Sequence, residues 1–304
     1  MDQFKLKDSS SYDSVAEHFA RFTDIVTKSL AETLVRFAGP PASGRVLDVG
    51  TGSGIVALRA AEQPGGVSVA GVDLSDGLLA VAQRKMRETG LSPKIHLVKS
   101  DAETLPFADG SFDAVLSLFA LLHFPHPHTA LLEMYRVLKP GGRLAIGIGS
   151  GPPWNSWQGW RHRLSRVSDL IDLKTGKLLL APSHLNRIVE RHLSSGAGPE
   201  ETELARGHGS RAPKAAMLIR SLGLDGLRTY WEGHHLRLQN AEEFWDLQST
   251  FSSIARKRLG SCTQMQLQEV RRVFDEECRD VLRHNGRLEY HYAAFFFAGT
   301  KPGR

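Results

Sequence analysis

Short apolar runs alternate with helix-spaced apolar positions over the first half of the chain. The apolar runs predict strands at 46–49, 67–73, 94–99, 112–118 and 143–148. Apolar residues at helix spacing lie between them, at 55–62, 76–90 and 129–138. This alternation is typical of βαβ units, so the pattern predicts a parallel sheet with helices on both of its faces.

Outside this region the pattern is mainly helical. Residues 11–38 carry apolar side chains at helix spacing until Gly39-Pro40-Pro41 interrupts them. After Gly149 the pattern is less regular. The elements expected there are helices at 213–222, after the cap Asn240 and after the cap Thr263, and strands at 229–238 and 288–297.

Three parts follow from this organisation. We expect an N-terminal helical lid at residues 1–38 and a core at residues 39–149. Residues 150–304 would supply cap insertions together with the last two strands of the same sheet. The length of the chain suits one large α/β domain with insertions.

The composition limits the cellular location and the kinds of partner that we expect. Of the 304 residues 41% are hydrophobic, yet no apolar run is long enough to cross a membrane. The formal net charge is +5, and solvated helix faces explain clusters such as Arg161, Arg163 and Arg166 more readily than a nucleic-acid groove does. The N-terminus lacks the apolar core of a signal peptide. We expect a cytoplasmic protein without a transmembrane segment or nucleic-acid partner, either a monomer or a homodimer.

A glycine-rich turn joins the first strand to the first helix. Residues 46–54 read Val-Leu-Asp-Val-Gly-Thr-Gly-Ser-Gly. Glycine lets the backbone approach a ligand closely, and the helix N-terminus behind the turn offers unpaired N–H groups. A dinucleotide site has the spacing G-x-G-x-x-G, whereas this turn has G-x-G-x-G with Asp48 two residues ahead of it. The turn alone leaves a nicotinamide cofactor and a chance glycine-rich turn as alternatives.

Acidic residues follow the next two strands. Asp73 ends the second strand, 23 residues after the first glycine of the turn, where a carboxylate can accept from both ribose hydroxyls. It could instead cap the next helix, although Ser75 and Asp76 already offer that cap. Asp101 can accept from an adenine amino group, and the N–H of Ala102 can donate to a ring nitrogen. The sequence therefore predicts a nucleoside site at the carboxyl ends of the strands.

The ordered set of motifs resembles a known family. The glycine turn, Asp73, Asp101-Ala102 and the Arg-Val-Leu-Lys-Pro-Gly-Gly stretch at 136–142 resemble the class I S-adenosylmethionine-dependent methyltransferases. They are similar to the broad group that includes ubiquinone and menaquinone C-methyltransferases and small-molecule methyltransferases. Residues 12–19 resemble the N-terminal helix that closes over the cofactor in that group. The resemblance implies a Rossmann-like, doubly wound sheet of seven strands with the last one antiparallel, and S-adenosylmethionine as the cofactor.

The resemblance also implies which residues bind the cofactor. The methionine portion would lie against the turn, and Asp48 would hold the turn and, through water or backbone, the cofactor's ammonium group. The full set is Tyr12, Asp48, Gly50, Thr51, Gly52, Asp73, Leu74, Asp101, Ala102, Glu103, Ser117 and Leu118. Two signatures of the quinone enzymes are missing, a Tyr-Asp-x-Met-Asn stretch and a Glu-x-Ser tail after the Lys-Pro-Gly-Gly turn.

Methyl transfer needs a nucleophile in line with the methyl group and often a base. His123, just beyond the fourth strand, is the candidate base, and packing of its ring in the local turn is the alternative. His126 and His128 stand beside it, but prolines separate the histidines and we expect no metal site. Candidate acceptor-binding residues, which could equally be core residues, are Phe19, Trp154, Trp157, His234 and Tyr290.

We expect methyl transfer to a small molecule, with O-methylation of a natural product or secondary metabolite as the first choice. A quinone-type C-methyltransferase, an RNA methyltransferase and a non-catalytic module that only binds the cofactor are the alternatives. The sequence Ser117-Leu118-Phe119-Ala120 after the fourth strand lacks the Asn/Asp-Pro-Pro-Tyr/Phe pattern of enzymes that methylate base amino groups. Methylation of adenine N6 or cytosine N4 is therefore not expected.

Overall fold

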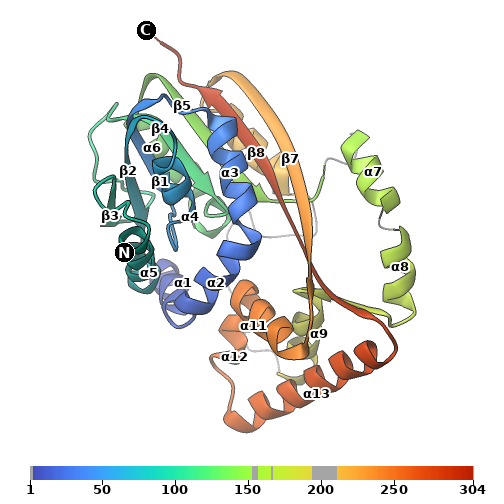
Figure 1. The fold of residues 1–304 in the computed structure, drawn as a ribbon. Coiled ribbons are helices and arrows are strands. Elements are labelled where there is room, and N and C mark those ends of the chain that lie inside the picture. The colour runs from blue at the N-terminus through green and yellow to red at the C-terminus, as the bar shows by residue number, and fades with distance from the viewer. Residues whose placement is uncertain (1–2, 153–156, 166, 194–210, 304) are drawn as a thin grey trace. The chain divides into compact units, whose positions relative to one another are not determined.

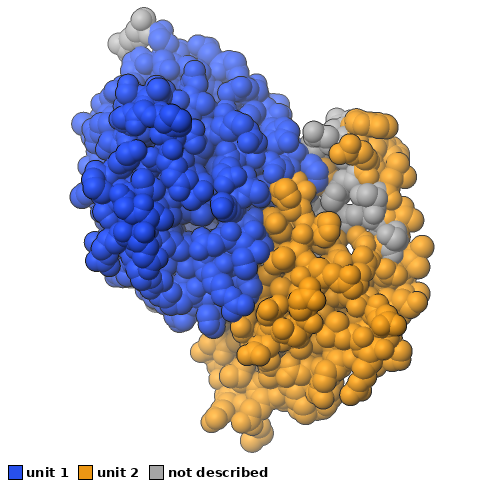
Figure 2. All heavy atoms as spheres, in the orientation of Figure 1, with its two compact units in different colours: residues 1–151, 201–232, 293–304 blue, residues 152–200, 233–292 orange. Residues whose placement is uncertain are grey.

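The computed structural model describes residues 3–152, 157–165, 167–193 and 211–303 (Figure 1). The chain divides into two compact units, each built from separated stretches of sequence (Figure 2). The first unit contains residues 1–151, 201–232 and 293–304, and the second contains residues 152–200 and 233–292. We call them the cofactor unit and the helical unit, after the predicted site and the main secondary structure of each.

A twisted sheet forms the centre of the cofactor unit. Its strands are β1 (Ser43–Val49), β2 (Gly66–Asp73), β3 (Ile95–Lys99), β4 (Phe112–Leu118), β5 (Leu138–Gly149) and the end of β8 (Arg287–Thr300). The spatial order is β3-β2-β1-β4-β5-β8, with the first five strands parallel and β8 antiparallel to β5. The predicted doubly wound sheet with an antiparallel last strand is confirmed.

The described residues contain eight strands, one more than the sequence predicted. The short strand β6 (Leu178–Ala181) pairs in parallel with the first part of β8, and β7 (Asp225–Leu238) also pairs with β8. Four consecutive apolar residues carry no alternation, so periodicity could not separate β6 from the helical sequence around it.

Helices cover both faces of this sheet. On one face, α6 (Pro127–Val137) and α10 (Arg211–Arg220) share a core with inward side chains such as Leu47, Val115 and Ile146. The other face is covered by α3 (Lys28–Ala38) and α4 (Ile55–Ala61), which pack on each other and on the strands. Neighbouring side chains of a strand point to opposite faces, and because both faces are covered, β1, β2, β4 and β5 are buried over most of their length, whereas the edge strand β3 is more exposed.

The expected helix over residues 11–38 is three helices, and the first begins earlier than predicted. They are α1 (Gln3–Asp13), α2 (Ala16–Val26) and α3. Helical hydrogen bonds continue through Thr27, whose N–H donates to Thr23 O and whose carbonyl accepts from Ala31 N. The polar sequence of α1 has almost no apolar periodicity, so the pattern could not indicate that helix.

The helical unit contains α7 (Trp157–Ser165), α8 (Val167–Lys174), α9 (Ser183–His192), α11 (Ala241–Phe251), α12 (Ser253–Leu259) and α13 (Gln264–Arg283). Both predicted caps are confirmed. Asn240 accepts from the N–H of Glu243, and Thr263 forms a capping box with Gln266. The buried rings of Phe244 and Phe274 pack together between α11 and α13. None of the described helices has the length and apolarity needed to cross a bilayer.

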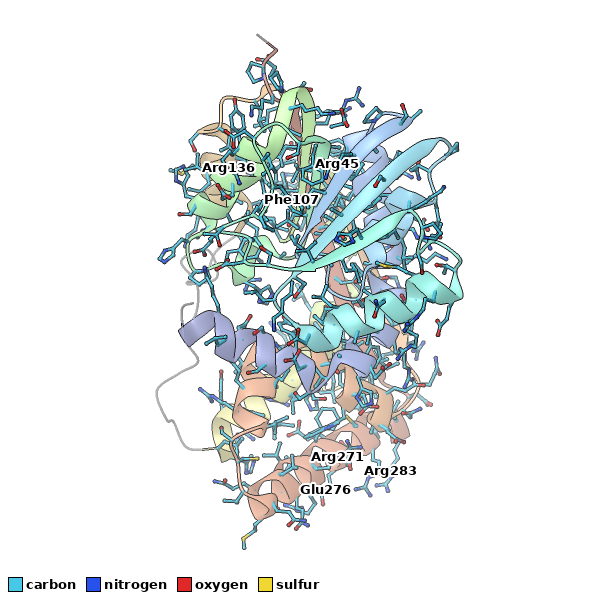
Figure 3. The ribbon with its side chains drawn as sticks, turned by 90° about the vertical axis from the view of Figure 1, so that its left-hand side faces the viewer. Arg45, Phe107, Arg136, Arg271, Glu276 and Arg283 are labelled. Atoms are coloured by element: carbon cyan, nitrogen blue, oxygen red, sulfur yellow. The ribbon has the colours of Figure 1, made fainter. Side chains whose placement is uncertain are left out.

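Charged side chains also pack on aromatic rings in both units, among them Arg45 and Arg271, which are labelled in Figure 3. The guanidinium of Arg45 lies 4.8 Å from the ring centre of Phe112, which meets Phe107 edge-on at 4.9 Å. On α13 the guanidinium of Arg271 lies 4.8 Å from the ring centre of Trp245. Such contacts bury the apolar faces of the rings while the charges remain near solvent.

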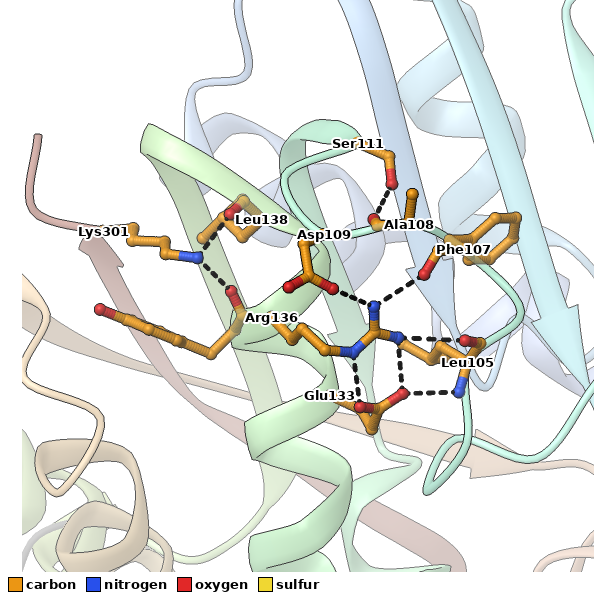
Figure 4. A network of polar contacts seen from close by, with 10 residues as sticks. Leu105, Phe107, Ala108, Asp109, Ser111, Glu133, Arg136, Leu138 and Lys301 are labelled. Atoms are coloured by element: carbon orange, nitrogen blue, oxygen red, sulfur yellow. Dashed lines mark hydrogen bonds and ion pairs between the residues drawn. The ribbon is translucent and has the colours of Figure 1, made fainter.

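The guanidinium of Arg136 ties the end of α6 to the loop before β4 (Figure 4). It makes a two-pronged ion pair with Glu133, at 2.7 and 2.8 Å, and an ion pair with Asp109 at 2.7 Å. It also donates to the carbonyls of Phe107 and Leu105, at 2.8 and 3.1 Å. Because Glu133 accepts from Leu105 N, the loop is held by donors and acceptors together.

Arg136→Met should therefore lower the free energy of unfolding by about 3 kcal/mol, because it leaves two loop carbonyls and a carboxylate without their hydrogen-bond donor. Arg136→Lys should restore less than half of that loss, because an ammonium group cannot reproduce the several hydrogen bonds that a planar guanidinium donates at once. Urea unfolding of the three proteins measures both effects. Arg84→Met is the matched control, since Arg84 pairs with Glu17 at an exposed site and its loss should be nearly neutral. A lysine variant as stable as the wild type would contradict the geometric explanation.

Candidate cofactor site

The predicted glycine turn follows β1 and approaches other backbone closely. Gly50 and Gly52 adopt positive φ angles of 72° and 53°. A Cβ atom added at Gly50 would lie 2.2 Å from the Cβ of Ala120, beyond β4, so only glycine fits there. At Gly52 the same added atom would come within 3.8 Å of the Phe19 ring. The turn therefore presents bare backbone beside an aromatic side chain at the carboxyl edge of the sheet.

Asp48 is fully buried behind this turn. One of its carboxylate oxygens accepts from the Thr51 hydroxyl at 2.6 Å and from Ala57 N at 3.1 Å. The other oxygen is buried and has no hydrogen-bond partner among the described residues. Burial raises the pKa of Asp48 to about 7, against the opposing effect of the two hydrogen bonds. In the structure Asp48 links the turn to the first part of α4.

Asp73 joins the end of β2 to the same turn. One carboxylate oxygen accepts from Gly52 N at 2.8 Å and the other from Ser75 N at 3.0 Å. Ser75, not Asp73, caps α5 (Asp76–Glu88), because the Ser75 hydroxyl accepts from Leu78 N at 3.1 Å. Burial raises the pKa of Asp73, although backbone N–H donors oppose the shift. Each oxygen keeps a lone pair that can accept from a ribose hydroxyl.

The acids after β3 are paired with Lys5, a residue that no sequence motif indicates. Lys5, on α1, places its ammonium 2.7 Å from Asp101 and 2.6 Å from Glu103. The second oxygen of Asp101 accepts from Glu103 N at 2.9 Å, and Glu103 accepts from His126 N at 2.9 Å. Burial opposes the charged form of Lys5, but the two carboxylates raise its pKa overall. Ala102, between the acids, is buried.

More of α1 faces the strand ends. Asp8 lies 3.3 Å from Nδ1 of His123, and the Tyr12 hydroxyl lies 3.4 Å from its Nε2. Asp13 accepts from the Ser75 hydroxyl at 2.6 Å and from a backbone N–H in the first turn of α5 at 2.9 Å. Residues 5, 8 and 12 share one helix face, because a helix turns about 3.6 residues per turn. Spacing alone could not have singled out Lys5 and Asp8, because the apolar pattern does not indicate that α1 is a helix.

The predicted residues at the end of β4 have mainly structural partners. The Ser117 hydroxyl is buried and donates to Val49 O at 2.8 Å, and Leu118 is buried as well. The next residue, Phe119, has a positive φ of 62°, which is rare for a bulky side chain. This conformation brings the chain back toward the turn, where Ala120 contacts Gly50. Leu74, beyond β2, is half-buried.

The predicted acceptor-binding residues fall in both units. Phe19 packs edge-on against Tyr12 at 5.4 Å between ring centres, in the cofactor unit. In the helical unit His234 stacks on Tyr292 at 5.5 Å, and Tyr290 is half-buried, with the pKa of its phenol raised because it is shielded from solvent. Trp157, in the same unit, is 78% exposed. Trp154 lies outside the described residues. Their contact with an acceptor stays a prediction.

The arrangement fits S-adenosylmethionine, the cofactor that the sequence motifs predict. A turn without Cβ atoms offers room for a methionine portion beside backbone N–H groups. The carboxylates of Asp73 and Asp101 follow neighbouring strands at the same edge, in the order that ribose and adenine require. The roles of the individual residues remain predictions.

Comparison with known proteins agrees with this geometry. Residues 47–146 match the family described as "Methyltransferase domain". The chain is 38% identical over 143 residues to the ubiquinone/menaquinone biosynthesis C-methyltransferase UbiE of Bartonella tribocorum, which covers 44% of this chain and 54% of that protein. It is 34% identical over 168 residues to the demethylmenaquinone methyltransferase of Porphyromonas gingivalis, which covers 53% of this chain and 68% of that protein. The chain thus spans about half the length of most of these relatives.

Among solved structures, the YcgJ protein of Bacillus subtilis resembles the chain with a TM-score of 0.52 at 21% identity. The similarity covers 90% of this chain and 98% of the other. At this identity the resemblance concerns the fold.

Asp48→Asn should flatten the dependence of stability on pH. Between pH 3.8 and about 7 the folded chain holds a proton on Asp48 that the unfolded chain has lost. The stability due to this group therefore falls as pH rises through that window, by at most about 4 kcal/mol. Urea unfolding at a series of pH values should show the stability of Asp48→Asn, relative to wild type, rising with pH. A constant difference across the window would contradict the raised pKa.

Asp113→Asn is the control of opposite sign for that series. Burial opposes ionisation of Asp113, but Arg45 N at 2.8 Å and the Lys139 ammonium at 2.7 Å lower its pKa overall. Its stabilising contribution is therefore present at neutral pH and disappears as pH falls through its lowered pKa.

Asp73→Asn should weaken binding of S-adenosylhomocysteine, the product form of the expected cofactor. Replacing a carboxylate that accepts from ribose hydroxyls costs about 10- to 100-fold in affinity, because charged acceptors make the stronger hydrogen bonds. Isothermal calorimetry measures the change, with Asp76→Asn as control, since Asp76 is exposed and pairs with Lys99. Equal affinity for wild type and Asp73→Asn would reject the ribose assignment.

Proposed function

The chain belongs to the class I S-adenosylmethionine-dependent methyltransferases, and on that premise we propose that it transfers the cofactor's methyl group to a small molecule. Family membership assigns S-adenosylmethionine as the cofactor. The observation that carries the proposal is the position of Asp73, which is tied to the glycine turn through Gly52 N and keeps lone pairs for a ribose.

The cofactor supplies a methyl group that is already strongly electrophilic, so the protein's part is to position and deprotonate the acceptor. His123 lies at the strand edge that carries the glycine turn and the two acids. The Asp8 carboxylate lies within hydrogen-bond distance of Nδ1 of this ring, and the Tyr12 hydroxyl lies beside Nε2. An imidazole whose Nδ1 is held by a carboxylate keeps Nε2 available to take a proton. We assign His123 as the general base and Asp8 as the residue that orients it.

The acceptor we propose is a hydroxylated, flat and hydrophobic compound. Loss of its hydroxyl proton activates the oxygen, which gives O-methylation of a natural product, our first choice. In a phenol the same deprotonation also activates the ring carbon beside the hydroxyl. C-methylation of a quinone precursor is therefore the second candidate, and the names of the relatives from Bartonella and Porphyromonas favour it. Aromatic side chains suit either acceptor.

Transfer of an isotope-labelled methyl group to a panel of phenols and quinols, with products identified by mass spectrometry, tests this proposal. The fragment ions in the mass spectrum distinguish O-methylated from C-methylated products. RNA included in the same assay tests the nucleic-acid alternative. A protein that binds S-adenosylhomocysteine tightly but methylates none of these compounds would support the non-catalytic alternative instead.

His123→Ala should lower kcat for an accepted phenol about 100-fold or more, while the affinity for S-adenosylhomocysteine stays within about threefold of wild type. Asp8→Asn should lower kcat about tenfold, and should have almost no further effect in the His123→Ala background, because it acts through His123. His128→Ala is the matched control, since His128 sits 3.5 Å from the Ser221 hydroxyl in the same unit. Unchanged kcat in His123→Ala, or additive losses in the double variant, would overturn these roles.

A further inference from the structure

Exposed apolar side chains concentrate on two consecutive helices of the helical unit. Of the fourteen large hydrophobic residues that are exposed in the described chain, seven lie in α7 and α8. These seven are Trp157 (78% exposed), Trp160 (58%), Leu164 (65%), Val167 (49%), Leu170 (59%), Ile171 (58%) and Leu173 (38%). Scattered exposed hydrophobic residues need no explanation, but a concentration of seven on two consecutive helices does.

Most of these side chains share one face of each helix. In α7 the positions 157, 160 and 164 follow the spacing i, i+3, i+7, and in α8 the positions 167, 170 and 171 follow i, i+3, i+4. Arg161 and Lys174 fall on the same two faces and are exposed. We call these eight residues the outer face of α7 and α8.

The acidic residues of this segment lie on the opposite side. Residues 157–174 contain only two acids, Asp169 and Asp172, at helix positions turned away from the outer face. Both are bound by the Arg287 guanidinium, at 3.0 and 2.8 Å. Arg287 also pairs with Glu289 at 3.1 Å. Asp169, Glu289 and His291 bring potential metal-binding atoms within 4.8 Å of one another, but Arg287 already provides the cation of that cluster.

Pairing of the acids with Arg287 leaves the rest of the segment basic. The four basic residues of 157–174 are Arg161, Arg163, Arg166 and Lys174. Two tryptophans, a row of aliphatic side chains and basic residues, without an acid on the same face, are the features of a helix that lies in a membrane interface. Tryptophan favours the headgroup level, and arginine and lysine are attracted to anionic lipids.

We infer that the outer face of α7 and α8 docks on the surface of an anionic lipid membrane. Charge complementarity favours this partner over a second copy of the chain, because two copies meeting through this face would bring their basic residues together. The helices are too short to span a bilayer, so they would lie along its surface with their apolar side chains among the headgroups. The inference concerns binding only, and it holds whether or not the chain transfers methyl groups.

Flotation of the full-length protein with phospholipid vesicles tests this inference. Vesicles containing phosphatidylglycerol should carry the protein, pure phosphatidylcholine vesicles should carry much less, and added salt should weaken the binding. The double variant Trp157→Gln/Trp160→Gln should lose at least about tenfold in partitioning, and Arg161→Gln roughly fivefold. Circular dichroism and thermal unfolding establish that each variant is folded.

Met265→Gln is the matched control, because Met265 is 79% exposed on α13 of the same unit and lies outside the outer face. It should bind vesicles as the wild type does. The inference is overturned if the wild type does not bind phosphatidylglycerol vesicles, or if the tryptophan double variant binds them as well as Met265→Gln.

Sedimentation velocity tests whether the face binds a second copy of the chain instead. Self-association of the wild type that disappears in the tryptophan double variant would assign the face to a second copy. Loss of methyl transfer would leave all these results unaffected, so the two proposals fail separately.

Discussion

The cofactor edge of the sheet depends on one constraint, the close packing of bare backbone in the turn after β1. Gly50 touches Ala120 and adopts a conformation that other residues avoid, so the segments after β1 and β4 can meet. Asp73 and Asp48 then hold the turn from two sides, by accepting from Gly52 N and from the Thr51 hydroxyl. The same carboxylates are costly to bury, which raises the pKa of both. The turn thus concentrates acceptors where a cofactor with hydroxyl and amino groups can use them.

The polar face of α1 matches the chemistry of the segments that it covers. Lys5 meets the paired acids after β3, Asp8 meets His123 after β4, and Asp13 meets the N-terminus of α5, where helix N–H groups favour a negative charge. Side-chain hydrogen bonds and ion pairs make these contacts, and the pair of Lys5 and Glu103 is largely shielded from solvent, with side chains that are 9% and 8% exposed.

The helical unit distributes its charges in the opposite manner. Arg287 forms ion pairs with the two acids of α8 and with Glu289 on one side of the helix. The other side of α7 and α8 carries apolar and basic side chains. Burial of Phe244 and Phe274 gives the unit a core of its own. A separate core allows the sequence of α7 and α8 to serve binding without reducing the stability of the sheet that carries the cofactor site.

The sequence by itself determined the alternation of strands and helices along the first half of the chain, the cofactor family and both C-terminal helix caps. Those features depend on local spacing: alternation of apolar residues, glycines at every second position, and a side chain that bonds a backbone N–H three residues away. Only the tertiary structure decided that Lys5 meets Asp101, that Asp8 lies beside His123, and that Arg287 binds the acids of α8. These partners are 96, 115 and 118 residues apart in the sequence. No local pattern encodes such pairs, because their energy comes from distances that exist only after the chain has folded.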